Sequence, residues 1–352
     1  MSGSINPSLY VNCTVETCPL NTSYYNYRVS LPANVVFVAL FGLALIWFIS
    51  VFIYSRRGLW FTIAMVLGTS CEIAGYAGRV FSWKNQWNQN AFLVQIICIT
   101  IGPAFLSAGI YLCLGRIIRV YGEANSRIPA KWYARIFIPC DVVSLILQAA
   151  GGVVATVALQ DNKSMTTGDN VMIAGLGTQV FTLLVFLVLA GDFAFSVYKR
   201  QRQMASNAVL PQDPTLVRIR GSWYFKGFMS ALGLATILIF WRSVYRVAEL
   251  NQGWTGPITF KQWLFVGMEP VLIAVAVWAL CFFHPSLCLR EAMSTSYKNV
   301  VGTSQPTIET NDTNSPLKNE DASKHNGTDP AVASVRGQPQ RLAAESASEE
   351  KL

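Results

Sequence analysis

The chain has 352 residues, of which 52% are hydrophobic and 13% are charged. Soluble domains carry about 25% charged residues, so this composition excludes an ordinary soluble protein and is typical of a membrane protein. The formal net charge is +8, and no nucleic-acid recognition module accompanies the basic residues, so we expect anionic membrane lipids and no nucleic acid as partners.

Residues 1–33 are expected to form a polar extracellular tail. They lack a basic start followed by an apolar core, so we expect no cleavable signal peptide and expect the first apolar run to direct insertion. Asn12 and Asn21 lie in glycosylation sequons, as does Asn162 further along the chain. Cys13 and Cys18 are placed to form a small disulfide, and two free thiols are an equally weighted alternative.

Seven apolar runs follow, each about 20 residues long and poor in charge, as a bilayer-spanning helix requires. They are residues 34–54, 59–81, 92–114, 136–159, 171–195, 223–245 and 263–283. The sequence therefore predicts an all-α membrane protein whose seven-helix transmembrane domain covers residues 34–285.

The distribution of Lys and Arg predicts the orientation of this bundle. These residues gather in the loops at 56–57, 116–135 and 199–220 and are scarce in the other loops. Basic loops face the cytosol, so the amino terminus is expected outside and the carboxy terminus inside. Residues 286–352 are rich in small polar and charged residues and are predicted to form a disordered cytosolic tail.

The second run contains the stretch Glu72-Ile-Ala-Gly-Tyr-Ala-Gly-Arg79, which places two charged residues at membrane depth. Residues seven apart return to nearly the same helix face, so Glu72 and Arg79 share a stripe with Tyr76 between them. The two glycines of the stretch would let a neighbouring helix approach closely. The stripe is either a structural pairing between helices or the wall of a polar binding site.

Other polar residues at similar depth are expected to face inward, because each would cost about 2.5–3.5 kcal/mol in hydrocarbon. Arg242, Arg246 and Glu249 recur on one stripe of the sixth run. The candidate substrate-binding residues are Glu72, Tyr76, Arg79, Gln148, Gln179, Arg242, Arg246, Glu249 and Glu269.

A sparser polar group is expected in the inner half of the bundle. Asp141 and Asp192 are candidate proton sites, with structural ion pairs as the alternative. Lys226 either reaches Asp192 or snorkels to the lipid headgroups, and we favour snorkelling. Pro103 and Pro270 remove backbone donors inside helices and should bend them.

The sequence carries no recognisable catalytic motif. It has no Gly-x-x-x-x-Gly-Lys-Ser/Thr phosphate loop, no Gly-x-Ser-x-Gly elbow and no Cys-x-x-Cys spacing. Its two histidines are His284 and His325, and a role at a helix end is favoured for His284 over haem ligation. We therefore expect no enzyme activity, no metal site and no cofactor.

Several segments in order carry a family resemblance. They are Glu72-Ile-Ala-Gly-Tyr-Ala-Gly-Arg79, Gly102-Pro103-Ala104-Phe105 through Gly115-Arg116, Asp141 through Gly152, Gly175-Leu176-Gly177-Thr178-Gln179, Arg242 through Glu249, and Glu269 through His284-Pro285. Together they resemble the fungal RTA-like, or lipid-translocating exporter, family. The resemblance covers roughly residues 34–285.

The resemblance implies a multi-pass protein of the fungal plasma membrane that transports or exports amphipathic lipids, such as sphingoid long-chain bases, and contributes to resistance against toxic compounds. Porphyrin or haem transport is an alternative within the family. The family's motif positions fall on the candidate residues above and on Asp141, and the family supplies no catalytic residue. A seven-span receptor or sensor for an amphipathic ligand is the rival interpretation. Nothing in the sequence indicates an oligomeric state.

Overall fold

The computed structural model of the protein describes residues 13, 17–20, 23, 25, 27–121, 126–161, 163–203, 221–252 and 262–288. Regular secondary structure in these ranges is helical throughout. Seven helical stretches within them are long and apolar enough to cross a membrane. The prediction of an all-α protein with seven helices able to span a membrane is thereby confirmed.

The helices extend beyond the predicted apolar runs. The first six spans are α1 Leu31–Ser55, α2 Leu59–Lys84, α3 Gln89–Tyr121, α4 Ala130–Gln160, α5 Thr166–Gln203 and α7 Trp223–Asn251. The seventh is divided into α8 Gln262–Val266, the π-helix η4 Gly267–Val271 and α9 Leu272–Phe282, and the short α10 Pro285–Cys288 follows. About 20 helical residues cross the hydrocarbon, so the longest helices project past it, and hydropathy alone underestimates their length.

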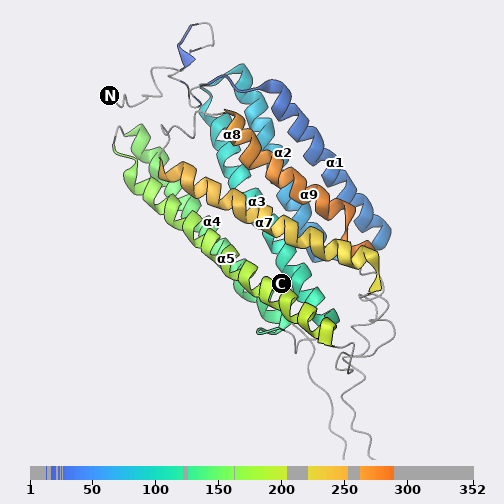
Figure 1. Cartoon of the computed structure of the whole chain (residues 1–352). Helices are drawn as coiled ribbons and strands as arrows, with labels where there is room; N and C mark the ends of the chain where they lie inside the picture. Colours follow the sequence, from blue (N-terminus) through green and yellow to red (C-terminus); the bar gives the residue numbers. More distant parts are fainter. Residues whose placement is uncertain are drawn as a thin grey trace, which may run out of the picture. The chain divides into compact units, whose positions relative to one another are not determined.

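Consecutive helices pack side by side from α1 to α5, and α7 packs against α3, α5 and α9. Contacts between α9 and α1 close the bundle. Figure 1 shows α1 on the flank opposite α4 and α5, with α3 between these flanks. Side chains of α3 are therefore placed to meet residues of several other helices.

Large apolar side chains are exposed along the middle of the helices, where a soluble protein would carry polar ones. Ile46 of α1, Val153 of α4, Val188 of α5 and Ile237 of α7 are 62%, 63%, 62% and 53% exposed. Bilayer hydrocarbon is the solvent that such a surface requires.

Glycines bring α2 and α3 into close contact. A methyl group added to Gly75 would lie 2.5 Å from Cγ1 of Ile99, and one added to Gly78 would lie 3.0 Å from the carbonyl oxygen of Ala91. Small residues allow this approach because they add no side-chain bulk between the two backbones. The expectation that the glycines of the 72–79 stretch admit a neighbouring helix is confirmed.

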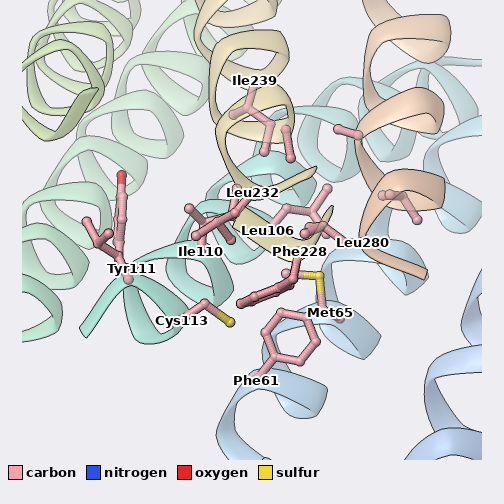
Figure 2. Close-up of a cluster of buried hydrophobic side chains, with 14 of the residues drawn as sticks. Phe61, Met65, Leu106, Ile110, Tyr111, Cys113, Phe228, Leu232, Ile239 and Leu280 are labelled. Carbon is pink, nitrogen blue, oxygen red and sulfur yellow. The ribbon is translucent and has the colours of Figure 1, made fainter. Parts of the chain in front are cut away.

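Large apolar side chains fill the interior between α2, α3, α7 and α9. Figure 2 shows Phe61 and Met65 of α2 meeting Leu106 of α3 and Phe228 of α7 in this core. Tyr111 lies at the edge of the cluster, and its hydroxyl points away from the other labelled side chains. The α3 face toward α4 is therefore the place where this core meets polar groups.

The end of the seventh span is tied to the loop between α1 and α2. Oγ of Ser286 donates a hydrogen bond to the carbonyl of Arg57 at 2.9 Å. His284 is buried against the rings of Phe48 and Phe61, and its Nδ1 accepts a hydrogen bond from the backbone N–H of Ser286. His284 thus lies at the turn before α10, as a helix-end role requires.

Gly175 and Gly177 of α5 provide a matched test of the contact between α4 and α5. A methyl group on Gly175 would lie 2.9 Å from the carbonyl oxygen of Ser144, whereas one on Gly177 meets nothing within 4 Å. We expect Gly175→Ala to destabilise the protein by about 1–3 kcal/mol by overpacking. Gly177→Ala should be neutral or stabilise by up to about 1 kcal/mol through helix propensity. Thermal unfolding of both variants in detergent measures this, and equal losses would contradict it.

Candidate functional site

Four buried charged residues of α7 and η4 form an ion-pair network, which we call the charged network: Arg242, Arg246, Glu249 and Glu269. Nη1 of Arg246 lies 2.6 Å from Oε2 of Glu249, and its Nε lies 3.2 Å from Oε1 of Glu269. Nη2 of Arg242 lies 3.4 Å from the same Glu269 oxygen. None of the four is more than 8% exposed, so two positive and two negative charges balance one another away from water.

Glu269 reaches the arginines from the π-helix η4, which the sequence analysis did not predict. Pro270 lies inside this segment. A proline cannot donate to the carbonyl four residues earlier and its ring crowds that carbonyl, so a wider helical turn relieves the clash. Such turns are frequent at functional sites. Pro270 was the available signal, and the segment that contains it has a changed helix register.

Arg242 also binds the backbone of α3 at a position created by a proline. Pro103 lies inside α3 and has no N–H, so the carbonyl of Ile99, four residues earlier, loses its helical partner. Nη2 of Arg242 donates to that carbonyl oxygen at 2.6 Å. Arg242 therefore satisfies the buried carbonyl of Ile99 and connects the charged network to the part of α3 where Pro103 removes a helical hydrogen bond.

Glu72 lies beside the charged network without being paired to it. It is 0% exposed and faces α3, since a methyl group on Gly102 would lie 2.7 Å from its Oε1. Arg242 and Glu269 lie close enough to Glu72 for their charges to interact with its carboxyl group. Within the described ranges, neither of its oxygens accepts a hydrogen bond and no ion pair involves it. Buried polar groups are normally paired, and the carboxyl group of Glu72 departs from this rule.

Arg79, which shares the predicted stripe with Glu72, is held by aromatic groups. Its guanidinium carbon lies 4.1 Å from the ring centroid of Phe265 on α8 and 5.4 Å from that of Tyr25. Its Nη2 donates to the hydroxyl of Tyr27 at 2.9 Å. Aromatic faces attract a cation most strongly where water is excluded. On this stripe Arg79 is bound by aromatic residues, Glu72 is unpaired in the described ranges, and no ion pair joins the two.

The segment before α1 enters the same end of the bundle. The hydroxyl of Tyr25 lies 3.0 Å from Oγ of Ser82 on α2 and 2.6 Å from Oε1 of Gln95 on α3. This contact fastens the chain across α2 and α3 near Arg79. The sequence analysis placed Tyr25 in a polar tail, although the run Tyr24-Tyr25-Asn26-Tyr27 next to an apolar span was a signal for membrane-edge packing.

Replacing the tyrosine hydroxyl to which Arg79 donates tests how much this hydrogen bond stabilises the protein. We expect Tyr27→Phe to destabilise the protein by about 1.5–3 kcal/mol, since hydrogen bonds to charged groups contribute this much. Tyr54→Phe is the control because Tyr54 is 76% exposed. The melting temperature of each variant in detergent is the measurement, and an equal effect of the two substitutions would show that Tyr27 does not hold Arg79.

Tyr76 lies on the α1 side of the stripe. Its ring packs 5.8 Å from that of Phe41 and 5.6 Å from that of Phe37, both on α1. The hydroxyl of Tyr76 also lies close enough to Glu72 and Glu269 to interact with their charges. Tyr76 therefore forms an aromatic wall between α1 and the charged end of the bundle.

The two candidate amides form a pair of their own between α4 and α5. Nε2 of Gln148 donates to Oε1 of Gln179 at 3.0 Å, and both residues are buried. No hydrogen bond found in the described ranges joins the pair to the charged network. The close approach of Gly175 to Gln148 explains their meeting, since the added methyl group would lie 2.8 Å from Cγ of Gln148.

The two candidate proton sites differ in their surroundings. Oδ2 of Asp141 accepts hydrogen bonds from Ser107 at 2.9 Å and Tyr111 at 3.0 Å, and Asp141 is 3% exposed. The side chain of Asp192 is 32% exposed and forms an ion pair with Arg127 at 2.8 Å. A solvated carboxylate with a cation partner is a structural ion pair, which is the alternative that the sequence left open for Asp192.

The contact of Asp192 with Arg127 also explains the position of Lys226. The hydrogen bond and the charge of Asp192 raise the pKa of Arg127, a loop residue. Lys226 makes no ion pair in the described ranges and is exposed, in agreement with the favoured snorkelling. The sequence analysis missed Arg127 as the partner of Asp192, because the two residues are far apart in the sequence.

The amino-terminal cysteines Cys13 and Cys18 form a disulfide. The sequon asparagines Asn12, Asn21 and Asn162 lie outside the described residues, so their glycosylation stays a prediction. Within the described ranges, no group of three or more His, Cys, Asp or Glu residues is arranged to hold a metal ion.

Comparisons with known proteins identify relatives that align with much of the chain. The family described as RTA1-like protein matches residues 65–292. A sphingoid long-chain base transporter of Saccharomyces cerevisiae, RSB1, is 34% identical over 309 residues, which cover 82% of this chain and 78% of that protein. Protein RTA1 of the same yeast is 29% identical over 62% of this chain and 65% of its own length, and protein RTM1 is 30% identical over 64% and 68%. No solved structure matches.

Proposed function

We propose a lipid-transport function for this chain because it belongs to the RTA1-like protein family. Its relative named as a sphingoid long-chain base transporter aligns over most of both chains. We propose that this chain moves amphipathic lipids of the same class between the leaflets of a membrane. The substrate is an alkyl chain with a protonated amine in its headgroup.

The observation that carries the proposal is the free carboxylate of Glu72. Among the predicted acceptors, Glu269 is occupied by Arg242 and Arg246, which leaves Glu72 for a ligand. An ammonium group brought to Glu72 supplies the donors that both carboxylate oxygens lack. The charged network fixes the orientation of Arg242 beside this site while contributing no excess charge of its own.

The substrate's two ends fit two environments of the bundle. Its ammonium group pairs with Glu72 in the interior, whereas its alkyl chain lies against the exposed apolar belt of the helices. Such a division avoids placing the charged headgroup in hydrocarbon, where it would cost about 2.5–3.5 kcal/mol. Gly102 lets the carboxyl group of Glu72 pack directly against α3, because it has no side chain on the facing helix.

The finer parts of the proposal concern orientation and cellular role. The basic loops support an amino terminus outside and a carboxy terminus in the cytosol. In that orientation Glu72 lies in the outer half of the membrane, which suits the release of an exported lipid at the outer face. We place the protein in the plasma membrane, where such export would contribute to resistance against toxic amphipathic compounds.

Transport is tested with purified protein in liposomes that contain a fluorescent long-chain base. A membrane-impermeant quencher added outside reports which leaflet holds the label. We expect faster transbilayer movement than in protein-free liposomes of the same lipid composition. Saturable binding of the base without faster movement would overturn the transport proposal and indicate a receptor.

A further inference from the structure

A second buried carboxylate, outside the charged network, lies between α3 and α4. Asp141 is 3% exposed, and Ser107 and Tyr111, which bind it, are 1% and 0% exposed. Asp141 and Glu72 are the fully enclosed acids that lack an ion pair in the described ranges, since Glu249 and Glu269 are paired with arginines. The charge of Asp141 therefore needs another form of compensation.

Two hydroxyl groups provide part of that compensation. Both Ser107 and Tyr111 donate to Oδ2 of Asp141, at 2.9 and 3.0 Å, and Oδ1 has no hydrogen-bond partner. Two neutral donors do not cancel a full negative charge at membrane depth, whereas a bound proton does. The site is closed by aromatic rings, because Tyr111 packs 4.5 Å from Phe186 of α5 and 5.4 Å from Phe137 of α4.

Ser107 can satisfy Asp141 with or without a proton. Its Oγ lies 2.8 Å from the carbonyl oxygen of Ala104 and 2.9 Å from Oδ2 of Asp141, and a hydroxyl can donate its single hydrogen to only one of them. When Asp141 is ionised, Ser107 donates to Oδ2. When Oδ2 carries a proton, that proton is donated to Oγ and Ser107 turns its hydrogen to Ala104. Ser107 can therefore accommodate Asp141 in either protonation state.

From this geometry we propose that Asp141, with Ser107 and Tyr111, is a proton-binding site that couples proton movement to lipid transport. The inference rests on the proposed transport function and adds its energy source. Tyr111 is the titratable side chain that faces Asp141 from α3, Cys140 is its neighbour on α4, and α5 presents the ring of Phe186 at this place. No charged side chain of the described ranges lies within ion-pair distance of Asp141.

The connection to the lipid site runs along α3. Ile99 binds Arg242, Gly102 faces Glu72, and Ser107 and Tyr111 bind Asp141, so a few turns of one helix contact both acids. Pro103 interrupts the hydrogen-bond ladder between these contacts, which makes this part of α3 the place where the helix can bend. Protonation of Asp141 changes the hydrogen bonds of Ser107 and Tyr111, which follow Pro103 in α3. Lipid binding at Glu72 acts on Gly102, which precedes Pro103.

Infrared difference spectroscopy of the full chain tests proton binding without any lipid substrate. The stretching band of protonated carboxylic acids should grow as the pH is lowered, and Asp141→Asn should remove a component of this band that Glu72→Gln leaves in place. Asp192→Asn is the matched control, because that carboxylate is exposed and paired with Arg127. Ser107→Ala should shift the pH at which the band appears. A band unchanged by Asp141→Asn would overturn the proposed proton site.

Coupling is tested in liposomes with a fluorescent long-chain base and an imposed pH gradient. We expect the gradient to raise the initial rate of movement for the wild type and for Asp192→Asn, whereas Asp141→Asn loses this response and keeps movement without a gradient. Protein-free liposomes measure the passive response of a weak base. Wild-type movement that ignores the gradient overturns the coupling and leaves the transport function standing. A wild type that moves no lipid overturns the transport function, and the coupling with it.

Discussion

Replacing Glu72 by Gln is expected to reduce binding and movement of a sphingoid long-chain base by about 10- to 150-fold. A hydrogen bond to a charged group contributes about 1.5–3 kcal/mol, which corresponds to this range of affinity. The amide has the same shape as the carboxylate but no charge for an ammonium group. The measurement is transbilayer movement of the fluorescent base in liposomes, together with its binding to the purified protein.

The same substitution should leave the fold intact. Glu72 makes no ion pair or hydrogen bond in the described ranges, so its neutralisation breaks no contact and removes a buried charge. Asp161→Asn is the control, since Asp161 is an exposed acid that pairs with Lys163. If Glu72→Gln unfolds the protein, or if well-folded Glu72→Gln transports at the wild-type rate, Glu72 is not the headgroup acceptor.

The spans and the inward-facing residues were predictable because both follow from the cost of polarity in hydrocarbon. Runs of apolar residues identify the helices, and a charged residue inside such a run must point away from lipid. Glu72, Arg242 and Glu269 are buried for this reason. Composition and spacing along one helix carry this information without any knowledge of the other helices.

The partners of these residues were not predictable, because they depend on how separate helices meet. Arg79 and Glu72 share a helix face, yet Arg79 binds Tyr27 from a segment outside the predicted spans. Arg242 binds a carbonyl that exists as a free acceptor only because Pro103 follows it. Each contact joins residues far apart in the chain, so helical periodicity cannot select it.

Helix register was a further obstacle. If the seventh span were a regular α-helix, the face on which Glu269 lies would follow from its position in the sequence. The π-helix η4 rotates the residues that it contains onto another face. Asp192 shows the same limit at a helix end, where a loop arginine rather than Lys226 occupies it. Two acids that looked alike as candidate proton sites are therefore different, and burial separates Asp141 from Asp192.

Glu269→Gln is expected to cause the largest loss of stability among single substitutions at the charged network. Oε1 of Glu269 lies between Arg242 and Arg246, so its neutralisation leaves two buried guanidinium groups to share Glu249. Removing one partner of a buried ion pair costs about 3–5 kcal/mol. Asp192→Asn breaks the exposed pair with Arg127 and should cost less than about 1 kcal/mol.

Unfolding of Glu269→Gln, Arg242→Met and the double variant in detergent separates the ion pair from other effects of each substitution. Arg242→Met alone also frees the carbonyl of Ile99, so it should destabilise the protein by itself. In the double variant the uncompensated charge of Arg242 is gone, and we expect a loss smaller than the sum of the single losses by about 0.5–3 kcal/mol. Strict additivity would mean that Glu269 does not stabilise the bundle through its ion pair with Arg242. In that case the network would not fix Arg242, and Arg242 would be free to compete with a substrate's ammonium group for Glu72.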